Sequence, residues 1–241
     1  MKKDLLVCIA FHYAPERLKY LHSVLANFIN TYEVSLDIII DTNSDTFTLL
    51  DYPADIKIVS HTHLEHPFHL TGMHRQHIKD NIDNYENFYY VEDDELLPYE
   101  NYLNYLENFK ALYPKYVPSF VRIEVKDEVE YISDIPEKQP LEIIEVGGKQ
   151  FNAFKFPINY CGMWIMPQKE LKGAITEDFT KLSDGREFNA MFVGWGLQKP
   201  ALVEIENGLI SKKCYSYHLP NNYALSEGTP NGKIKPENIF R

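Results

Sequence analysis

Short apolar runs alternate with amphipathic segments over the first part of the chain. Four runs are continuous and mostly apolar, the pattern of strands buried on both faces of a sheet. These runs are residues 5–11, 34–40, 56–59 and 88–91. Between them, apolar residues recur at spacings of three and four over 18–28 and 70–82, which predicts two amphipathic helices. This order predicts an α/β fold with a mostly parallel central sheet and right-handed crossovers.

The pattern changes after a third predicted helix over 99–112. At 121–126, apolar residues alternate with charged ones, which predicts a strand with one exposed face. Two runs over 141–146 and 149–156 flank Gly147-Gly148 and predict a β-hairpin. A short helix is expected over 188–192. The last twenty or so residues are polar and rich in Gly and Pro, so they are expected to wrap the surface or form a lid.

Composition narrows the class of protein. With 241 residues, 44% of them hydrophobic, the chain can bury one sizeable core. A net charge of −11 argues against duplex nucleic acid or an anionic membrane as a partner. The three cysteines lie far apart, as buried thiols in a reducing compartment do. The chain shows no signal peptide and no stretch long enough to span a bilayer, so a cytoplasmic protein is expected.

The strongest chemical signal is the end of the fourth apolar run. Phe88–Val91 leads directly into Glu92-Asp93-Asp94-Glu95, four consecutive carboxylates at the carboxyl end of a predicted strand. Open α/β sheets bind ligands at that edge. Clustered carboxylates beside a core are costly unless a cation shares them, and oxygen ligands favour Mg²⁺ or Mn²⁺ bridging to a phosphate. The alternative is a solvated acidic turn.

Other strand ends bring further polar residues to the same edge. The first run ends in Phe11-His12-Tyr13 and the second in Asp41–Asp45, and Arg75 lies on the predicted helix before the fourth run. In this order, the features of residues 4–100 resemble the GT-A glycosyltransferases, most closely glycosyltransferase family two and its relatives. The resemblance implies a GT-A (Rossmann-like) sheet flanked by helices, with a smaller mixed β region on the acceptor side. It implies a single domain over 1–241, with a nucleotide-binding half (1–98) and an acceptor half (99–241).

The resemblance also assigns roles to residues that bind the nucleotide. By likeness, the turn after the first strand, Phe11, His12 and Tyr13, flanks the base and ribose. Asp41 binds the base, and Asp45 is the acid that follows it. Arg75 approaches the nucleotide. From the residue types alone, the aspartates could instead cap a turn and Arg75 could form a surface ion pair.

The acidic cluster resembles the family's Asp-x-Asp motif with glutamate in the first place. The likeness makes Asp94 the direct ligand of Mn²⁺ or Mg²⁺, Glu92 a supporting acid for ribose or a metal-bound water, and Asp93 the least engaged member of the donor site. His218 is the expected second protein ligand, with a hydrogen-bonded surface histidine as the alternative. Gly162, in Tyr160–Pro167, matches the glycine beneath the donor sugar, where the backbone approaches closely.

The acceptor side carries a weaker pattern. Gly194-Trp195-Gly196 is similar to an acceptor loop of some galactosyltransferases, yet Leu197-Gln198-Lys199 stands where those have acids. Inverting transfer needs a carboxylate base. Asp184 and Glu187 are the candidates, with helix capping as the alternative, and a retaining mechanism stays open.

Six histidines lie between residues 61 and 77, at spacings that occur in metal sites. They are His61, His63, His66, His69, His74 and His77. No cysteine joins them, and they straddle a predicted loop and helix. We therefore expect some of them to line the nucleotide cleft and others to be solvated, rather than to form a dedicated zinc site.

Together these features predict a metal-dependent glycosyltransferase of the hexosyltransferase type, moving a sugar from a nucleotide-diphosphate donor to an acceptor hydroxyl. The expected partners are a UDP-sugar and a glycan or other hydroxyl acceptor. A nucleotidyltransferase acting on a sugar phosphate is an alternative, although Phe11–Pro15 contains no glycine-rich, lysine-bearing phosphate loop. A non-catalytic glycan- or protein-binding module is the third hypothesis.

Overall fold

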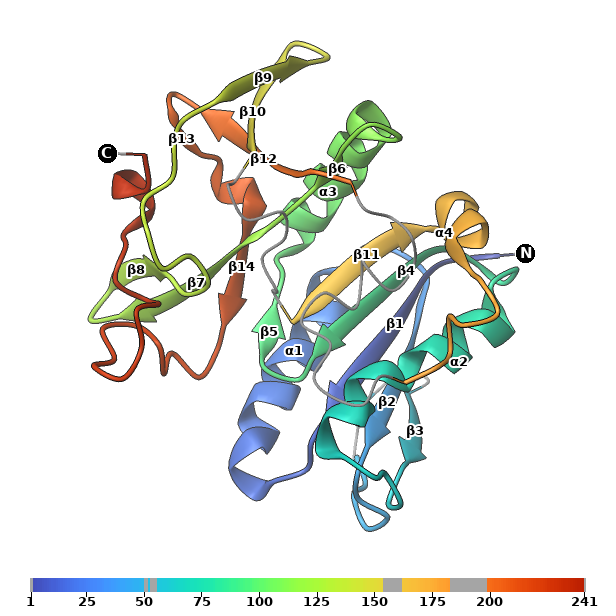
Figure 1. The fold of residues 1–241 in the computed structure, drawn as a ribbon. Coiled ribbons are helices and arrows are strands. Elements are labelled where there is room, and N and C mark those ends of the chain that lie inside the picture. The colour runs from blue at the N-terminus through green and yellow to red at the C-terminus, as the bar shows by residue number, and fades with distance from the viewer. Residues whose placement is uncertain (1, 50–51, 53–55, 154–161, 183–198, 241) are drawn as a thin grey trace. The chain divides into compact units, whose positions relative to one another are not determined.

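The computed structural model describes residues 2–49, 52, 56–153, 162–182 and 199–240 (Figure 1). The chain divides into two compact units. The first comprises Met1–Asp94 and Gly162–Gln198, and the second comprises Glu95–Cys161 and Lys199–Arg241. The single domain expected from the sequence stays a prediction.

A five-stranded sheet in the order β11-β4-β1-β2-β3 forms the first unit (Figure 1). Its strands are β1 (Lys3–Phe11), β2 (Leu36–Thr42), β3 (Ile56–Ser60), β4 (Tyr85–Glu92) and β11 (Met163–Pro167). β4, β1, β2 and β3 pair in parallel, and β11 runs antiparallel to β4. From β1 the chain adds β2 and β3 on one side and then β4 on the other, so the sheet has a topological switch point between β1 and β4.

The helices of the first unit follow the predicted periodicity. They are η1 (Pro15–Arg17), α1 (Leu18–Thr31), η2 (Pro67–Gly72), α2 (His74–Asn81) and α4 (Gln168–Ala174). Pro15 begins η1, and α1 continues from it with Leu21, Leu25 and Phe28 on its buried side. The two helices predicted between the strands are therefore confirmed, the second as a 3-10 segment followed by an α-helix.

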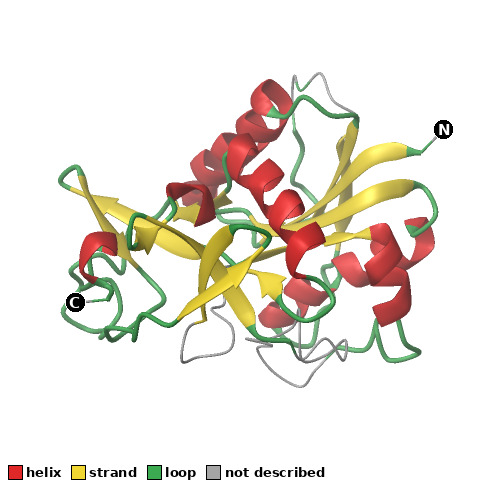
Figure 2. Cartoon of the chain, turned by 90° about the horizontal axis from the view of Figure 1, so that it is seen from above, coloured by secondary structure: helices red, strands yellow, loops and turns green. Residues whose placement is uncertain are grey.

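Two further sheets lie in the second unit; Figure 1 labels their strands, and Figure 2 draws all strands of the chain in yellow. One has the order β13-β12-β10-β9, with β6 pairing to β12, and the other has the order β5-β14-β7-β8. The strands are β5 (Glu95–Leu96), β6 (Val117–Pro118), β7 (Val121–Lys126), β8 (Val129–Ile132), β9 (Ile143–Val146), β10 (Lys149–Ala153), β12 (Ala201–Glu206), β13 (Leu209–Ile210) and β14 (Tyr215–His218). The helical segments are α3 (Tyr99–Leu112), η3 (Lys212–Cys214) and η4 (Pro236–Asn238).

Parallel and antiparallel pairs occur in each of the three sheets. The chain is thus α/β and compatible with a Rossmann-like fold, but its described sheets are mixed rather than one mostly parallel central sheet. The predicted hairpin is confirmed: β9 and β10 pair across Gly147 and Gly148, whose φ angles of 61° and 80° suit glycine.

The exposed polar face predicted for residues 121–126 is confirmed at Lys126 but is wrong at Arg122 and Glu124. Arg122 and Glu124 are buried, because β7 lies between β14 and β8 and the residues after β14 cover its polar face. The backbone N–H groups of Tyr223 and Ala224 donate to Glu124 Oε2 at 2.8 and 2.5 Å. Over residues 121–124 the alternation of apolar and charged residues therefore marks two buried faces, one of which satisfies its charges internally, whereas Val125 and Lys126 are exposed.

The carboxyl-terminal segment is built into the second unit. Ile234 pairs with Ile132 at the end of β8, and Ile239 is fully buried in the apolar cluster around Val121 and Ile123. The expectation of a surface wrap or lid therefore missed the apolar anchors of this segment. Among the described residues, no helix is long and apolar enough to cross a membrane.

Gly232 is a position where this segment requires glycine. Its φ is +70°, and an added Cβ would lie 2.2 Å from the carbonyl oxygen of Tyr223. We expect Gly232→Ala to lower the free energy of unfolding by at least about 2 kcal/mol, because backbone strain and a steric clash add. Urea denaturation of the second-unit transition measures the loss.

Gly228→Ala is the matched control for this substitution. Nothing lies within 4 Å of a Cβ placed at Gly228, so a change within about 0.5 kcal/mol is expected there. Equal unfolding midpoints for the two variants would contradict the requirement for glycine at position 232.

Candidate active site

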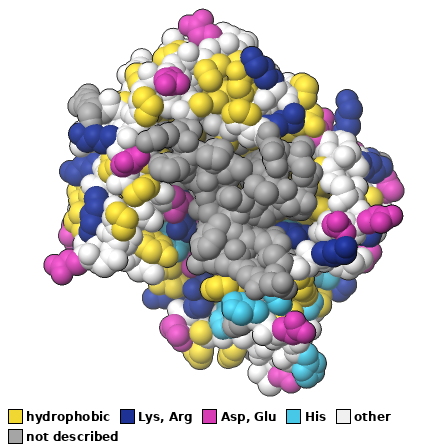
Figure 3. All heavy atoms as spheres, in the orientation of Figure 1, with side chains coloured by type: hydrophobic (Ala, Val, Ile, Leu, Met, Phe, Trp, Pro, Cys, Tyr) yellow, Lys and Arg dark blue, Asp and Glu magenta, His cyan; other side chains and the backbone are white. Residues whose placement is uncertain are grey.

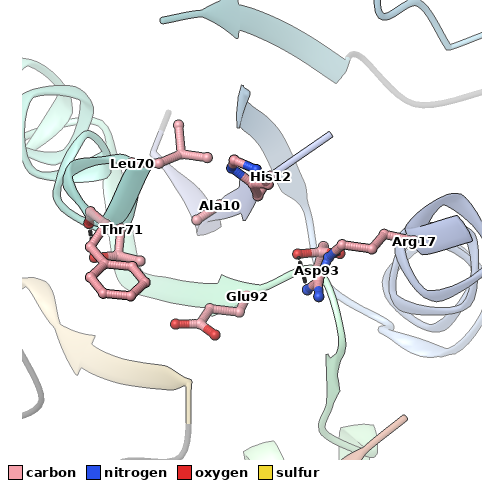
Figure 4. A pocket seen from close by; sticks show the side chains of 8 residues that line it. Ala10, His12, Arg17, Leu70, Thr71, Glu92 and Asp93 are labelled. Carbon is pink, nitrogen blue, oxygen red and sulfur yellow. Dashed lines mark hydrogen bonds and ion pairs between the residues drawn. The ribbon is translucent and has the colours of Figure 1, made fainter. Parts of the chain in front are cut away.

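A cavity of about 270 Å³ opens at the carboxyl ends of β1 and β4 (Figure 4). It is lined by Ala10, His12, Arg17, Phe68, Leu70, Thr71, Glu92 and Asp93. The two strands that frame it, β1 and β4, lie on either side of the sheet's topological switch point. Ligands of open α/β sheets bind at such switch points. Three residues that the sequence assigns to the donor site, His12, Glu92 and Asp93, therefore meet at one cavity.

An ion pair closes one side of the cavity. The Arg17 guanidinium donates from Nε and Nη2 to the two oxygens of Asp93, at 2.9 and 2.8 Å, and from Nη2 to Asp94 Oδ2 at 2.9 Å. Both aspartates are buried, with 2% and 6% of their surface exposed. Figure 4 shows Arg17 reaching Asp93, while Glu92 points away from this pair.

Arg17 is the functional residue that sequence reasoning missed. The acidic cluster requires a cation, and an arginine from η1 supplies it within the protein. The acids therefore do not by themselves demand a metal ion, and a solvated acidic turn is also wrong. The available signal was an arginine that starts the first helix, close behind the first strand end.

Burial keeps the Asp93 carboxyl easy to protonate. It raises the pKa of Asp93 to about 7, the hydrogen bond from Arg17 opposes this rise, and the neighbouring Asp94 charge adds to it. The cavity therefore holds a carboxyl whose charge changes near neutral pH.

Gly162 lies beside Glu92 at the entry to β11. Its carbonyl oxygen accepts the Glu92 N–H at 2.8 Å, and its φ is +66°. A Cβ at this position would lie 3.5 Å from the Glu92 carboxyl carbon. The close approach expected of this glycine is thus seen toward the Glu92 side chain, and its role beneath a donor sugar stays a prediction.

The last residue of β1 and the residues that follow β1 and β2 form an aromatic cluster. Phe11 is fully buried, and its ring lies 4.9 Å from that of Phe47 and 5.9 Å from that of Tyr13. The Tyr13 N–H donates to Asn43 Oδ1 at 2.7 Å, which joins the ends of β1 and β2. Phe11 is thus a packing residue that supports Tyr13, and Asp45 is exposed.

Asp41 and Arg75 are both buried, with 1% and 3% of their surface exposed. Asp41 Oδ1 accepts hydrogen bonds from the Nε2 atoms of His61 and His77, at 2.7 and 2.8 Å. Although burial opposes it, these bonds lower the pKa of Asp41. Arg75 Nη1 donates to the carbonyl oxygen of Lys181 at 3.2 Å, so a surface ion pair is wrong for Arg75.

His218 lies in the second unit, at the end of β14. Its Nδ1 is 2.5 Å from Glu124 Oε1, and 6% of its surface is exposed, so a surface histidine is wrong. A carboxylate on Nδ1 favours the tautomer whose Nε2 carries the lone pair that metals bind. Glu95, which directly follows Asp94 in the chain, is the register partner of His218. Glu124 was missed from the sequence because the alternation of β7 suggested exposure.

The predicted base candidates Asp184 and Glu187 lie outside the described residues, as do the helix expected over 188–192 and Gly194-Trp195-Gly196. Their assignment as general base therefore stays a prediction. Contact of Asp41 with the nucleotide base and binding of a metal ion by Asp94 and His218 also stay predictions.

No protein-family model matches the chain, and no curated protein matches it. Among solved structures, the crystal structure of S. aureus TarS 1-349 is similar, with a TM-score of 0.48 and 12% sequence identity. The likeness covers 89% of this chain, which spans 60% of the TarS chain.

The ion pair yields a stability prediction. Replacing Arg17 by Met leaves Asp93 and Asp94 buried without their cation, so the free energy of unfolding at pH 7.5 falls by about 3 kcal/mol. This is the lower end for a broken buried pair, because 30% of the Arg17 side chain is exposed. Urea denaturation of both proteins measures the difference.

The loss should depend on pH. The pKa of Asp93 in the folded protein is about 7, above its value in the unfolded chain, so the folded carboxyl loses its charge near neutral pH and the deficit shrinks as the pH falls through about 7. Lys19→Met, an exposed change on α1, is the control and leaves stability nearly unchanged. A pH-independent deficit would argue against the unpaired carboxyls as its cause.

Proposed function

We propose that this protein is a metal-dependent glycosyltransferase that moves a sugar from a nucleotide-diphosphate donor, a UDP-sugar, to an acceptor hydroxyl. One observation carries the proposal. The cavity at the switch point between β1 and β4 is lined by Glu92 and Asp93, the acids that resemble a donor-binding motif. A cavity of this size and position suits part of a nucleotide, with His12 and Arg17 available to meet it.

The proposed metal ion is Mn²⁺ or Mg²⁺, held by Asp94 and His218. The donor set fits, because Mn²⁺ accepts both carboxylate oxygen and imidazole nitrogen. Support comes from the Glu124 carboxylate on His218 Nδ1, the second-layer partner typical of metal-binding histidines. When bound, the ion neutralises the charge that develops on the leaving nucleoside diphosphate.

The chain's own residues would divide the remaining work. Glu92 is proposed to contact ribose or a metal-bound water, and Gly162 beside it to leave room for the donor sugar. Arg17 holds Asp93 and Asp94 in place before any ligand arrives. Asp184 or Glu187 is proposed as the base that deprotonates the acceptor hydroxyl.

Calorimetric titration with UDP, with and without Mn²⁺, tests the proposal. We expect binding that requires Mn²⁺ and that falls at least about tenfold in Asp94→Asn, since a direct ligand is lost. Asp80→Asn, an exposed aspartate on α2, is the matched control and binds as the unchanged protein does. No UDP binding under either condition would reject the proposal.

A second variant tests whether the orientation of His218 by Glu124 matters for metal binding. Glu124→Gln keeps an oxygen for the backbone donors at Tyr223 and Ala224 but removes the charge beside His218. We expect Mn²⁺ affinity in the presence of UDP to fall about 10- to 100-fold, with the circular dichroism spectrum unchanged. Unaltered affinity would remove His218 from the proposed metal site.

A further inference from the structure

Three potential ligand atoms converge in the first unit away from the cavity at the switch point. They belong to Asp41, His61 and His77, and all lie within 4.8 Å of one another. None of these residues lines the cavity that holds Glu92 and Asp93. The residue pattern did not favour a dedicated zinc site, because no cysteine joins the histidines and they straddle a predicted loop and helix.

The fold explains how they meet. Asp41 is the penultimate residue of β2, and His61 directly follows β3, the next strand of the sheet. The His61 N–H donates to the carbonyl oxygen of Thr42 at 2.7 Å, which fixes the start of the loop against β2. His77 lies on α2. Three segments therefore present one carboxylate and two imidazoles to a common point.

Hydrogen bonding leaves part of the Asp41 carboxylate unused. Both imidazoles are hydrogen-bonded to Oδ1, while Oδ2 is buried and has no hydrogen-bond partner among the residues that the structure describes. An unsatisfied buried carboxylate oxygen is costly, and a cation beside the carboxylate would compensate it. The two imidazoles retain 18% and 15% side-chain exposure, so an ion has a route from solvent.

From these observations we propose that Asp41, His61 and His77 form a binding site for Zn²⁺ or a similar transition-metal ion. Two imidazole nitrogens and one carboxylate oxygen suit Zn²⁺, Co²⁺, Ni²⁺ and Fe²⁺ better than Mg²⁺. Ligands at about 2.0–2.2 Å from zinc lie roughly 3.4 Å apart in a tetrahedron. The present 2.7 and 2.8 Å separations therefore open by about 0.6 to 0.7 Å when the ion enters between the side chains.

The bound ion would join the ends of β2 and β3 to α2 and keep one coordination position for water. This role for Asp41 differs from the base contact that the family resemblance implies, and it involves neither Asp94 nor His218. Figure 3 shows histidine side chains gathered at the lower end of the visible face, where Figure 1 has the segment between β3 and α2. Exposed members of this run, such as His63, provide controls.

Competition of the full-length, tag-free chain with a chromophoric chelator for Zn²⁺ tests the site. We expect one tight equivalent in the unchanged protein and at least about 100-fold weaker binding in His61→Ala/His77→Ala. His63→Ala/His69→Ala, taken from the same histidine run, should bind as the unchanged protein does. Wild-type affinity in the first variant, or a loss only in the second, would overturn the proposal.

Two measurements keep the test decisive if the double variant folds poorly. His61→Ala alone removes the loop ligand and should still weaken Zn²⁺ at least about tenfold. Co²⁺ bound to the unchanged protein should show visible absorption that disappears when a chelator removes the ion. A colourless Co²⁺ complex would contradict the site. No nucleotide is present in these titrations and no zinc in the UDP titration, so either proposal can fail alone.

Discussion

The ion pair between Arg17 and the aspartates after β4 is the interaction on which the cavity depends. Asp93 and Asp94 are consecutive, buried and alike in charge, and Glu92 precedes them. Without a cation, that arrangement would favour protonated carboxyls or an opened strand end. Because Arg17 comes from the segment between β1 and α1, its bidentate contact also ties the ends of β1 and β4 together. The cavity lies beside this ion pair, and Arg17 and Asp93 both line it.

The second unit solves the same physical problem with its own residues. Arg122 donates to Asp134 at 2.7 Å and to Ser133 at 3.0 Å inside the sheet that contains β7. Burial nevertheless raises the pKa of Asp134 to about 6. Beside this pair, Glu124 binds His218 and two backbone N–H groups. The orientation of His218 is therefore set by a buried polar network to which the polar face of β7 contributes Glu124.

Local pattern sufficed for most elements of the fold. The apolar run before Phe11, the spacing of Leu21, Leu25 and Phe28, and the Gly147-Gly148 turn each act over a few residues, and each predicted its element correctly. Pattern failed where partners are distant. The charges of β7 looked solvated because nothing near them in the sequence shows that the chain returns to cover them some 100 residues later.

The candidate site likewise has features that local pattern predicts and features that depend on distant partners. The order of residues alone shows that acids follow an apolar strand, and the strand order places them at a ligand-binding edge, since parallel strands present their carboxyl ends together. Which side chains contact those acids depends on the folded chain. Arg17 and Asp93 are 76 positions apart, and Asp41 and His77 are 36 apart. Residue type fixes the charge that a side chain can carry, but pairing, burial and pKa depend on neighbours that the folded chain brings together.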